Sequence, residues 1–335
     1  MTEAVTANSS AVVEFEGAIK DYGNNKIIGP ADLKISKGEI VGFLGPNGSG
    51  KTTCIRLILG LIKPTSGSVK VNGLDPIRHH VEALKNVAYS PELPNIQTFL
   101  NPRQFLDLVS HELNFQDKAS RSNQISQVLE LVGLREYSEI KIGKLSKGMV
   151  QRLSIAQALM GSPQTLILDE PMIGLDPAGV AHFREVFKEF ASQERGTVFM
   201  SSHIMGEVES LCTSVAIIHR GKILFKGPVD EVVQEVLGYS IVQLETSQLT
   251  SQTIQQLREM PGIRQVNTKS NSKNEKLIDL EITVCGQDGD IRPQISDLIV
   301  KSGAKLYTIK PGENMLEKAY IEALKEKKVT NLEQC

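Results

Sequence analysis

The sequence has few features that would cross-link the chain or carry it through a membrane. Cys54, Cys212, Cys285 and Cys335 are scattered without C-x-x-C spacing, which indicates neither a disulfide framework nor a zinc site and is typical of a reducing compartment. No apolar run approaches the roughly 18 residues that a transmembrane helix needs, and the polar N-terminus lacks a signal-peptide pattern. We therefore expect any membrane-spanning part to belong to another polypeptide.

The sequence also lacks an excess of charge of one sign. Its 335 residues include 37 basic and 39 acidic ones, for a net charge of -2. No broad field therefore favours nucleic acid or an acidic membrane face as a partner. The composition is that of an ordinary globular protein, 40% hydrophobic and 23% charged, and the length suits roughly two or three domains.

What the sequence does contain is a glycine-rich stretch between a buried-strand pattern and a helical pattern. Residues 45–53 read GPNGSGKTT and meet the pattern G-x-x-x-x-G-K-[ST] directly after the apolar run 39–44. This context predicts a phosphate-binding loop. Glycines let backbone N–H groups converge on phosphate oxygens, and the following helix adds its positive dipole end. The predicted nucleotide contacts are Gly45, Pro46, Asn47, Gly48, Ser49, Gly50, Lys51, Thr52 and Thr53.

Acidic residues complete the predicted site. Lys51 should reach the outer phosphates, and Thr52 should ligate a Mg²⁺ ion that bridges them. Asp169 stands at the end of a continuous apolar strand pattern, where ligand sites of parallel sheets gather, and it can hold the metal through water. Glu170, next to it, can accept a proton from the attacking water or orient it. These residues predict nucleotide hydrolysis.

In this order the residues resemble the ATP-binding subunit of ATP-binding cassette (ABC) transporters. LSKGMVQR, residues 145–152, resembles that family's signature segment. The resemblance implies that the segment acts in trans, with Ser146 and Gly148 facing the γ-phosphate held by a second copy. Lysine and methionine stand where the family often has glycine and glutamine, and both positions look tolerant. Taken alone, the stretch is also a helix cap. The signature residues are Leu145, Ser146, Lys147, Gly148 and Met149.

Further family elements follow. Leu175 and Asp176 resemble the D-loop that connects the two sites of a dimer, and His203, after the strand pattern TVFMSS, matches the switch histidine that contacts the γ-phosphate. Tyr22 matches the aromatic residue that stacks on adenine, and a turn tyrosine accounts for it as well. The resemblance thus implies ATP as the nucleotide.

One position departs from the family pattern. Glu92 stands where the family has the glutamine of its glutamine loop. A carboxylate can still ligate Mg²⁺, and its effect on turnover or nucleotide preference stays open. Gln97 is a poor substitute because it lies five residues later.

The predicted fold class is α/β: a P-loop NTPase of the ABC type, with an antiparallel β subdomain and a helical subdomain, followed by a small α+β ferredoxin-like domain. Phe99, Leu100, Phe105 and Leu106 either line a groove for a helix of the membrane partner or pack the helical subdomain. An exposed hairpin is expected at 271–275. The expected ranges are a flexible tail 1–12, an ATPase domain 13–238 with its helical subdomain at about 91–160, a C-terminal domain 239–328 and a tail 329–335.

The resemblance implies an ATPase that dimerises with a second copy of itself on ATP and drives separate integral membrane subunits at the inner face of the cell membrane, with no nucleic acid partner. The stretch 314–320, NMLEKAY, is similar to an ending of bacterial and archaeal exporter subunits and favours export. An amphipathic closing helix explains it equally well. Two alternatives remain: an importer ATPase with a regulatory, ligand-binding C-terminal domain, and a soluble ABC ATPase outside transport.

Overall fold

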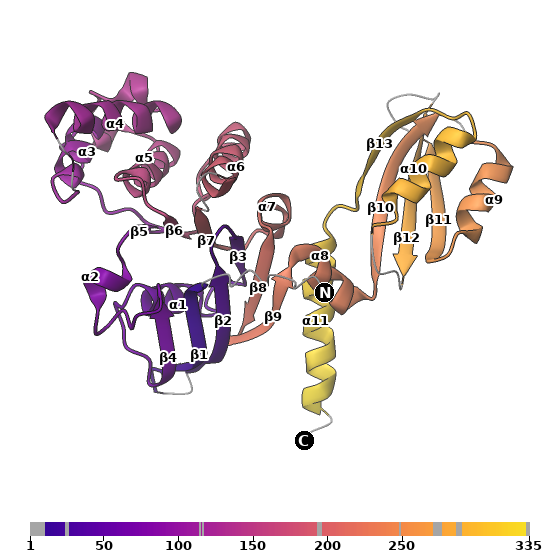
Figure 1. Cartoon of the computed structure of the whole chain (residues 1–335), viewed down its shortest axis with the longest axis horizontal. Coiled ribbons are helices and arrows are strands. Elements are labelled where there is room, and N and C mark those ends of the chain that lie inside the picture. The colour runs from indigo at the N-terminus through magenta and orange to yellow at the C-terminus, as the bar shows by residue number, and fades with distance from the viewer. Residues whose placement is uncertain are drawn as a thin grey trace, which may run out of the picture. The chain divides into compact units, whose positions relative to one another are not determined.

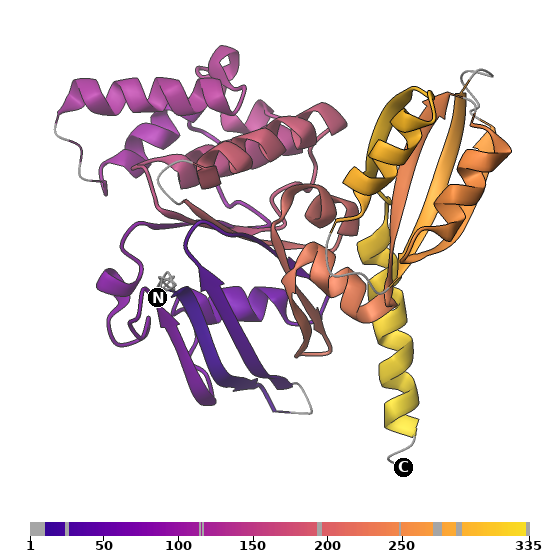
Figure 2. The same ribbon diagram turned by 45° about the vertical axis from the view of Figure 1, so that its right-hand side comes forward.

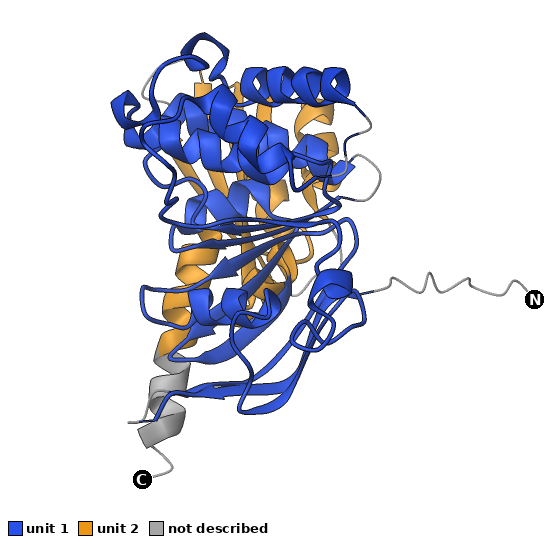
Figure 3. Cartoon of the chain, turned by 90° about the vertical axis from the view of Figure 1, so that its left-hand side faces the viewer, with its two compact units in different colours: residues 1–227 blue, residues 228–335 orange. Residues whose placement is uncertain are grey.

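The structure, a computed structural model, describes residues 11–23, 27–113, 115, 117–192, 196–247, 249–270, 277–285 and 290–332. The chain divides into two compact units, residues 1–227 and 228–335 (Figure 3). We expected the first domain to run to residue 238, whereas α8 (Val229–Leu237) packs against α11 (Met315–Leu332) within the second unit. The expected hairpin, residues 1–10 and residues 333–335 lie outside the described residues. The expected tails also covered residues 11–12 and 329–332, which instead belong to the first strand and to α11.

The first unit contains two sheets. A six-stranded sheet has the order β5-β6-β7-β3-β8-β9, and its strands β5 to β8 with β3 run parallel. A three-stranded antiparallel sheet has the order β2-β1-β4. The strands of the two sheets are β1 (Ala11–Asp21), β2 (Ile27–Ser36), β3 (Ile40–Leu44), β4 (Ser66–Val71), β5 (Val87–Ser90), β6 (Thr165–Asp169), β7 (Thr197–Ser202), β8 (Ser214–His219) and β9 (Lys222–Pro228).

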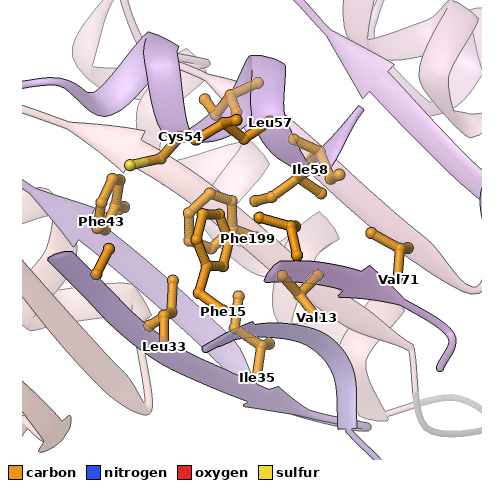
Figure 4. Close-up of a cluster of buried hydrophobic side chains, with 14 of the residues drawn as sticks. Val13, Phe15, Leu33, Ile35, Phe43, Cys54, Leu57, Ile58, Val71 and Phe199 are labelled. Atoms are coloured by element: carbon orange, nitrogen blue, oxygen red, sulfur yellow. The ribbon is translucent and has the colours of Figure 1, made fainter. Parts of the chain in front are cut away.

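The main core of this unit lies between the two sheets. Every residue of β3, β6 and β7 is buried, as expected for parallel strands covered on both faces. Apolar side chains of β1 and β2 meet α1 (Lys51–Ile58) and the six-stranded sheet, with Phe15, Phe43 and Phe199 at the centre of the cluster (Figure 4). This packing fixes α1, and therefore the loop before it, against the carboxyl ends of the central strands.

The helices α3 to α6 lie on the other side of the six-stranded sheet (Figures 1 and 2). Asn101 begins α3 with a capping box. Its side chain accepts from the backbone N–H of Gln104, and the Gln104 side chain accepts from the backbone N–H of Asn101. Of the four groove candidates, Phe105 and Leu106 are buried in the core, whereas Phe99 is 67% exposed. The helices of this unit are α2 (His80–Ala83), α3 (Pro102–Ser110), α4 (Lys118–Leu131), η1 (Arg135–Tyr137), η2 (Ile142–Lys144), α5 (Lys147–Leu159), α6 (Pro177–Ser192) and α7 (Met205–Leu211).

The second unit contains one four-stranded antiparallel sheet of order β11-β12-β10-β13. The order strand-helix-strand-strand-helix-strand agrees with the predicted plan. Alternate residues of β10 and β12, such as Leu244 and Ile282, join the core of this unit, and the residues between them are polar. Among the described helices, none is long and apolar enough to cross a membrane. The elements are β10 (Tyr239–Ser247), α9 (Ser251–Glu259), β11 (Ile263–Ser270), β12 (Leu277–Cys285), α10 (Arg292–Lys301) and β13 (Leu306–Pro311).

Candidate nucleotide site

The predicted phosphate loop connects the end of β3 to the start of α1. Gly48 and Gly50 have φ angles of 79° and 114°, in the left-handed region that glycine adopts most readily. Gly45 is required for a different reason, because a Cβ atom there would lie 2.4 Å from the Ile218 carbonyl oxygen. The loop therefore turns tightly beneath the free N–H groups at the start of α1, which is the geometry that binds an anion.

Three predicted site residues form a continuous polar chain beside this loop. The Lys51 ammonium donates to the Gly45 carbonyl oxygen at 2.7 Å and lies 3.1 Å from Glu170 Oε1. The other oxygen of the same carboxylate lies 2.9 Å from Nδ1 of His203. The side chains of Lys51 and Glu170 are 7% and 6% exposed, and that of His203 is 38% exposed. A buried carboxylate thus joins the loop lysine to a histidine that reaches solvent.

The second acid lies deeper in the site. Asp169 is buried at the end of β6, and its Oδ2 accepts from the Thr52 hydroxyl at 3.2 Å. Its Oδ1 accepts from the Ser201 hydroxyl at 2.6 Å. Thr52 and Asp169 therefore place two hard oxygen donors together at the cavity wall, which suits the ligand preference of Mg²⁺.

Glu170 has an uncommon backbone conformation. Its φ angle is 49°, and a residue with a Cβ atom in this left-handed region costs about 1 to 2 kcal/mol. Its main-chain N–H donates to the Ser201 hydroxyl at 2.9 Å. Such conformations cluster at functional sites, where the surrounding structure holds them in place.

The turn that carries His203 is fixed by two neighbouring side chains. The Ser202 hydroxyl donates to Glu207 Oε2 at 3.0 Å and accepts from the Ile204 N–H at 3.0 Å. Burial raises the pKa of Glu207, and the nearby Glu170 charge adds to this rise, while the bond from Ser202 opposes it. Several acidic groups therefore share the region around His203.

A cavity of about 690 Å³ opens over these residues. Two buried side-chain oxygens, Glu170 Oε1 at the cavity wall and Ser49 Oγ within the loop, have no hydrogen-bond partner among the described residues, although Oε1 keeps its ion-pair contact with Lys51. Such oxygens are suited to a polar occupant. The lining residues are Tyr22, Ile28, Pro46, Asn47, Gly48, Gly50, Lys51, Thr52, Thr53, Arg56, Glu92, Asp169 and Glu170.

Sequence analysis missed two of the lining residues. Arg56 lies one helical turn beyond Thr52 on α1, and Ile28 comes from β2. The helical spacing i, i+4 from a predicted metal ligand was a usable signal for Arg56. Ile28 gave none, because its place depends on how the three-stranded sheet packs on the loop.

Tyr22, which could also be a turn tyrosine, and Glu92, at the position of the family's glutamine, both line the cavity. Tyr22 is 49% exposed, with the Lys20 ammonium 5.5 Å from its ring centroid. Glu92 is exposed at the wall, which includes it and not Gln97. Burial raises the pKa of Tyr89, and the charges of Asp169 and Glu92 raise it further. Glu92 therefore acts on the same electrostatic region as the deeper acid.

The signature and D-loop residues are described in full and lie outside this cavity lining. Ser146 caps α5 by accepting from the Met149 N–H at 3.3 Å. A Cβ atom at Gly148 would lie 2.5 Å from the Gly174 carbonyl oxygen, so the signature packs directly on the segment before the D-loop. Asp176 accepts from the Gly179 N–H at 3.0 Å, at the start of α6. The chain thus brings these two motifs together, and neither lines the cavity over its own phosphate loop.

Comparison with known proteins places this chain in a family. The sequence profile of the family described as ABC transporter matches residues 28–173. The bacitracin transport ATP-binding protein BcrA of Bacillus licheniformis is 33% identical over 94% of this chain and 98% of its own length. The Nod factor export ATP-binding protein I of Burkholderia orbicola is 30% identical over 70% of this chain and 77% of its own length.

Solved structures agree. One described as the ATP-binding subunit of an ABC transporter matches with a TM-score of 0.61 and 27% identity, over 67% of this chain and 92% of that one. A dimeric ATP-binding cassette bound to ADP and phosphate matches in fold, with a TM-score of 0.58 and 23% identity over 64% and 98% of the two chains. The chain belongs to the ATP-binding proteins of ABC transporters, and it is an ATPase of that family.

Proposed function

We propose that this cavity binds ATP with Mg²⁺ and that Glu170 activates the attacking water. The observation that carries the proposal is the polar chain Lys51–Glu170–His203, which lies beside the Thr52–Asp169 pair around one cavity. A phosphate oxygen in the cavity would compete with Gly45 and Glu170 for the Lys51 ammonium, and so would release the carboxylate. The acid would then be free to orient water and accept its proton.

The remaining residues have supporting roles in this proposal. The loop N–H groups and Lys51 hold phosphate oxygens and stabilise the charge that develops on them. Thr52 and Asp169, with Glu92 at the cavity wall, would hold Mg²⁺, which supplies further positive charge at the phosphates. Tyr22 would stack on the adenine ring. His203 would contact the terminal phosphate from the end of β7.

We further propose that a complete site takes two copies of the chain. The signature residues of one copy do not line the cavity over its phosphate loop, and a capped helix start at Ser146 presents N–H groups suited to an anion. In a two-fold dimer each signature would face the nucleotide of the partner, with the Leu175 and Asp176 loop between the two sites. ATP would then hold the copies together until hydrolysis releases them.

The test is the substitution Glu170→Gln. Glutamine keeps the size of the side chain and cannot accept the proton, so we expect nucleotide binding to persist, turnover to fall by at least about 100-fold, and a dimer to accumulate with ATP. Turnover is measured by phosphate release, and the dimer by light scattering after size exclusion. A variant with wild-type turnover would remove Glu170 from this role, and one that stays monomeric with saturating ATP would remove the shared site.

The proposed biological role is to power an exporter through separate integral membrane subunits, at the inner face of the cell membrane. The names of the relatives support it, since one acts in bacitracin transport and another in Nod factor export. For the contact with the membrane subunit we propose the segment between β5 and α3, where Leu93 and Phe99 are 81% and 67% exposed. Such exposed apolar side chains mark interaction surfaces.

Copurification tests this role. Substituting Leu93 and Phe99 together with glutamate should release the membrane subunit while ATP binding persists, because both residues lie outside the cavity lining. Val81→Glu, at a residue 79% exposed in α2, is the matched control. A membrane partner that stays bound to the double variant would exclude this surface. A neighbouring reading frame for a periplasmic-type binding protein would favour the importer reading, with the second unit as its regulatory domain.

A further inference from the structure

Ser201 connects the two acids of the site. It lies in β7, opposite Asp169 in the parallel ladder between β6 and β7, and it is fully buried. Its hydroxyl donates to Asp169 Oδ1 at 2.6 Å and accepts from the Glu170 N–H at 2.9 Å. One side chain therefore holds the carboxylate of one residue and the backbone of the next.

The first bond determines how Asp169 points. With Oδ1 engaged by Ser201, the other oxygen, Oδ2, is the one that faces Thr52 at 3.2 Å. Each oxygen of the Asp169 carboxylate then accepts one hydrogen bond, and rotation of the carboxylate about its χ2 angle would break both bonds together. A buried carboxylate with two such donors favours one orientation, because turning it would give up both hydrogen bonds in a largely desolvated position.

The second bond determines where Glu170 lies. The ladder between β6 and β7 ends at the pair Asp169–Ser201, so the Glu170 N–H bonds to a side chain of β7. This bond holds the residue at a φ angle of 49°. That turn directs the carboxylate toward Lys51 and His203 instead of continuing along the strand.

We propose that Ser201 is a positioning residue for ATP hydrolysis. Its hydroxyl fixes the orientation of the Asp169 carboxylate and the position of the Glu170 backbone at the same time. The proposal rests on the roles proposed above for these two acids. Ser201 is not among the residues that line the cavity, so it would act through its two neighbours. Displacing a reacting group by about 1 Å costs on the order of 100-fold in rate.

The experiment compares substitutions at Ser201 in the full-length chain. Ser201→Ala should lower kcat by about 100-fold and change the KM for ATP by less than about threefold, because the phosphate loop is untouched. Ser201→Thr keeps the hydroxyl and should recover most of kcat. Ser201→Cys, with a weaker donor of similar size, should fall between them, and it serves as the measured variant if the alanine variant does not fold.

Thr197→Val is the matched control for loss of a buried hydroxyl. Thr197 lies at the other end of the same strand, is also buried, and accepts from the Gly38 N–H at 3.1 Å. This variant should lower the melting temperature about as much as Ser201→Ala but keep kcat. Equal losses of kcat in both variants, or a threonine variant as slow as the alanine one, would overturn the proposal.

Glu170→Gln, measured in parallel, distinguishes a wrong role for Ser201 from a wrong role for Glu170. If it is inactive while Ser201→Ala (or Ser201→Cys) turns over at the wild-type rate, the positioning role is wrong and the site assignment stands. If Glu170→Gln is fully active, the assignment itself fails. The expected result is an inactive glutamine variant, a slow alanine variant and an active threonine variant.

Discussion

The two units of the chain treat charged side chains differently. In the first unit Lys51, Asp169 and Glu170 are buried, at 6%, 2% and 5% exposure. In the described part of the second unit the buried polar residues are two threonines, Thr246 and Thr253, and no charged residue is buried. Burying charge costs several kcal/mol per ion unless it is paired. Such arrangements cluster at functional sites, so the contrast supports the proposed assignment of ATP hydrolysis to the first unit.

The polar face of the second sheet makes the contrast sharper. It carries acids and lysines of its own, among them Lys269 and Glu281, around a cavity of about 450 Å³. These side chains are half-buried or exposed, as on an ordinary solvated surface. Both units have a cavity lined by charged residues. The units differ because Lys51 and Glu170 of the first unit are buried and paired with each other.

The largest expected effect comes from comparing one lysine in each unit. Lys51→Ala removes the buried cation of the phosphate loop and should lower ATP turnover by about 100-fold or more while weakening nucleotide binding. Lys269→Ala removes an exposed cation from the sheet of the second unit and should leave both unchanged. Phosphate release and nucleotide titration measure the two effects. Similar losses in both variants would contradict the assignment of catalysis to the first unit.

An intermediate effect is expected from the core of the second unit. Ile282→Ala empties a fully buried position there and should destabilise that unit by about 2 to 5 kcal/mol. Scanning calorimetry should show a transition at lower temperature. ATP turnover below that temperature should persist, because the site residues lie in the first unit.

Thr283→Ala is the control for this change. Thr283 neighbours the isoleucine on β12 and, by strand alternation, belongs to the polar face. Its substitution should change stability by less than about 0.5 kcal/mol. Loss of turnover in Ile282→Ala at temperatures where both units remain folded would show that catalysis depends on the second unit.

The smallest effect is a change in how stability depends on pH. The pKa of Glu207 is raised in the folded protein, chiefly by burial, so the folded state binds the proton more tightly than the unfolded state does. Wild-type stability therefore falls as pH rises from the ordinary glutamate range through the raised pKa. Glu207→Gln cannot ionise and keeps an acceptor for Ser202.

The stability of Glu207→Gln relative to wild type should accordingly grow with pH across that window and level off above it. Chemical denaturation midpoints at a series of pH values measure this difference. If the stability of Glu207→Gln relative to wild type fell as pH rises, that result would contradict the burial of this carboxylate.

Patterns in short stretches of the sequence predicted several parts of the candidate site. The phosphate loop and Asp169 at the end of β6 follow from strand and helix signals within a few residues of each, and His203 after β7 follows from its resemblance to the family's switch histidine. The strand-helix order of the second unit also followed from local strand and helix patterns. These features depend on neighbours in sequence, and the sequence alone therefore determined them.

The tertiary structure decided which of these residues act on one another. Ser201 meets Asp169 and Glu170 because the register of β7 beside β6 pairs residues more than 30 positions apart. Packing likewise buried Phe105 while leaving Phe99 exposed, and it joined α8 to the second unit. Such contacts depend on strand register and on how elements pack, and no window of neighbouring residues carries that information.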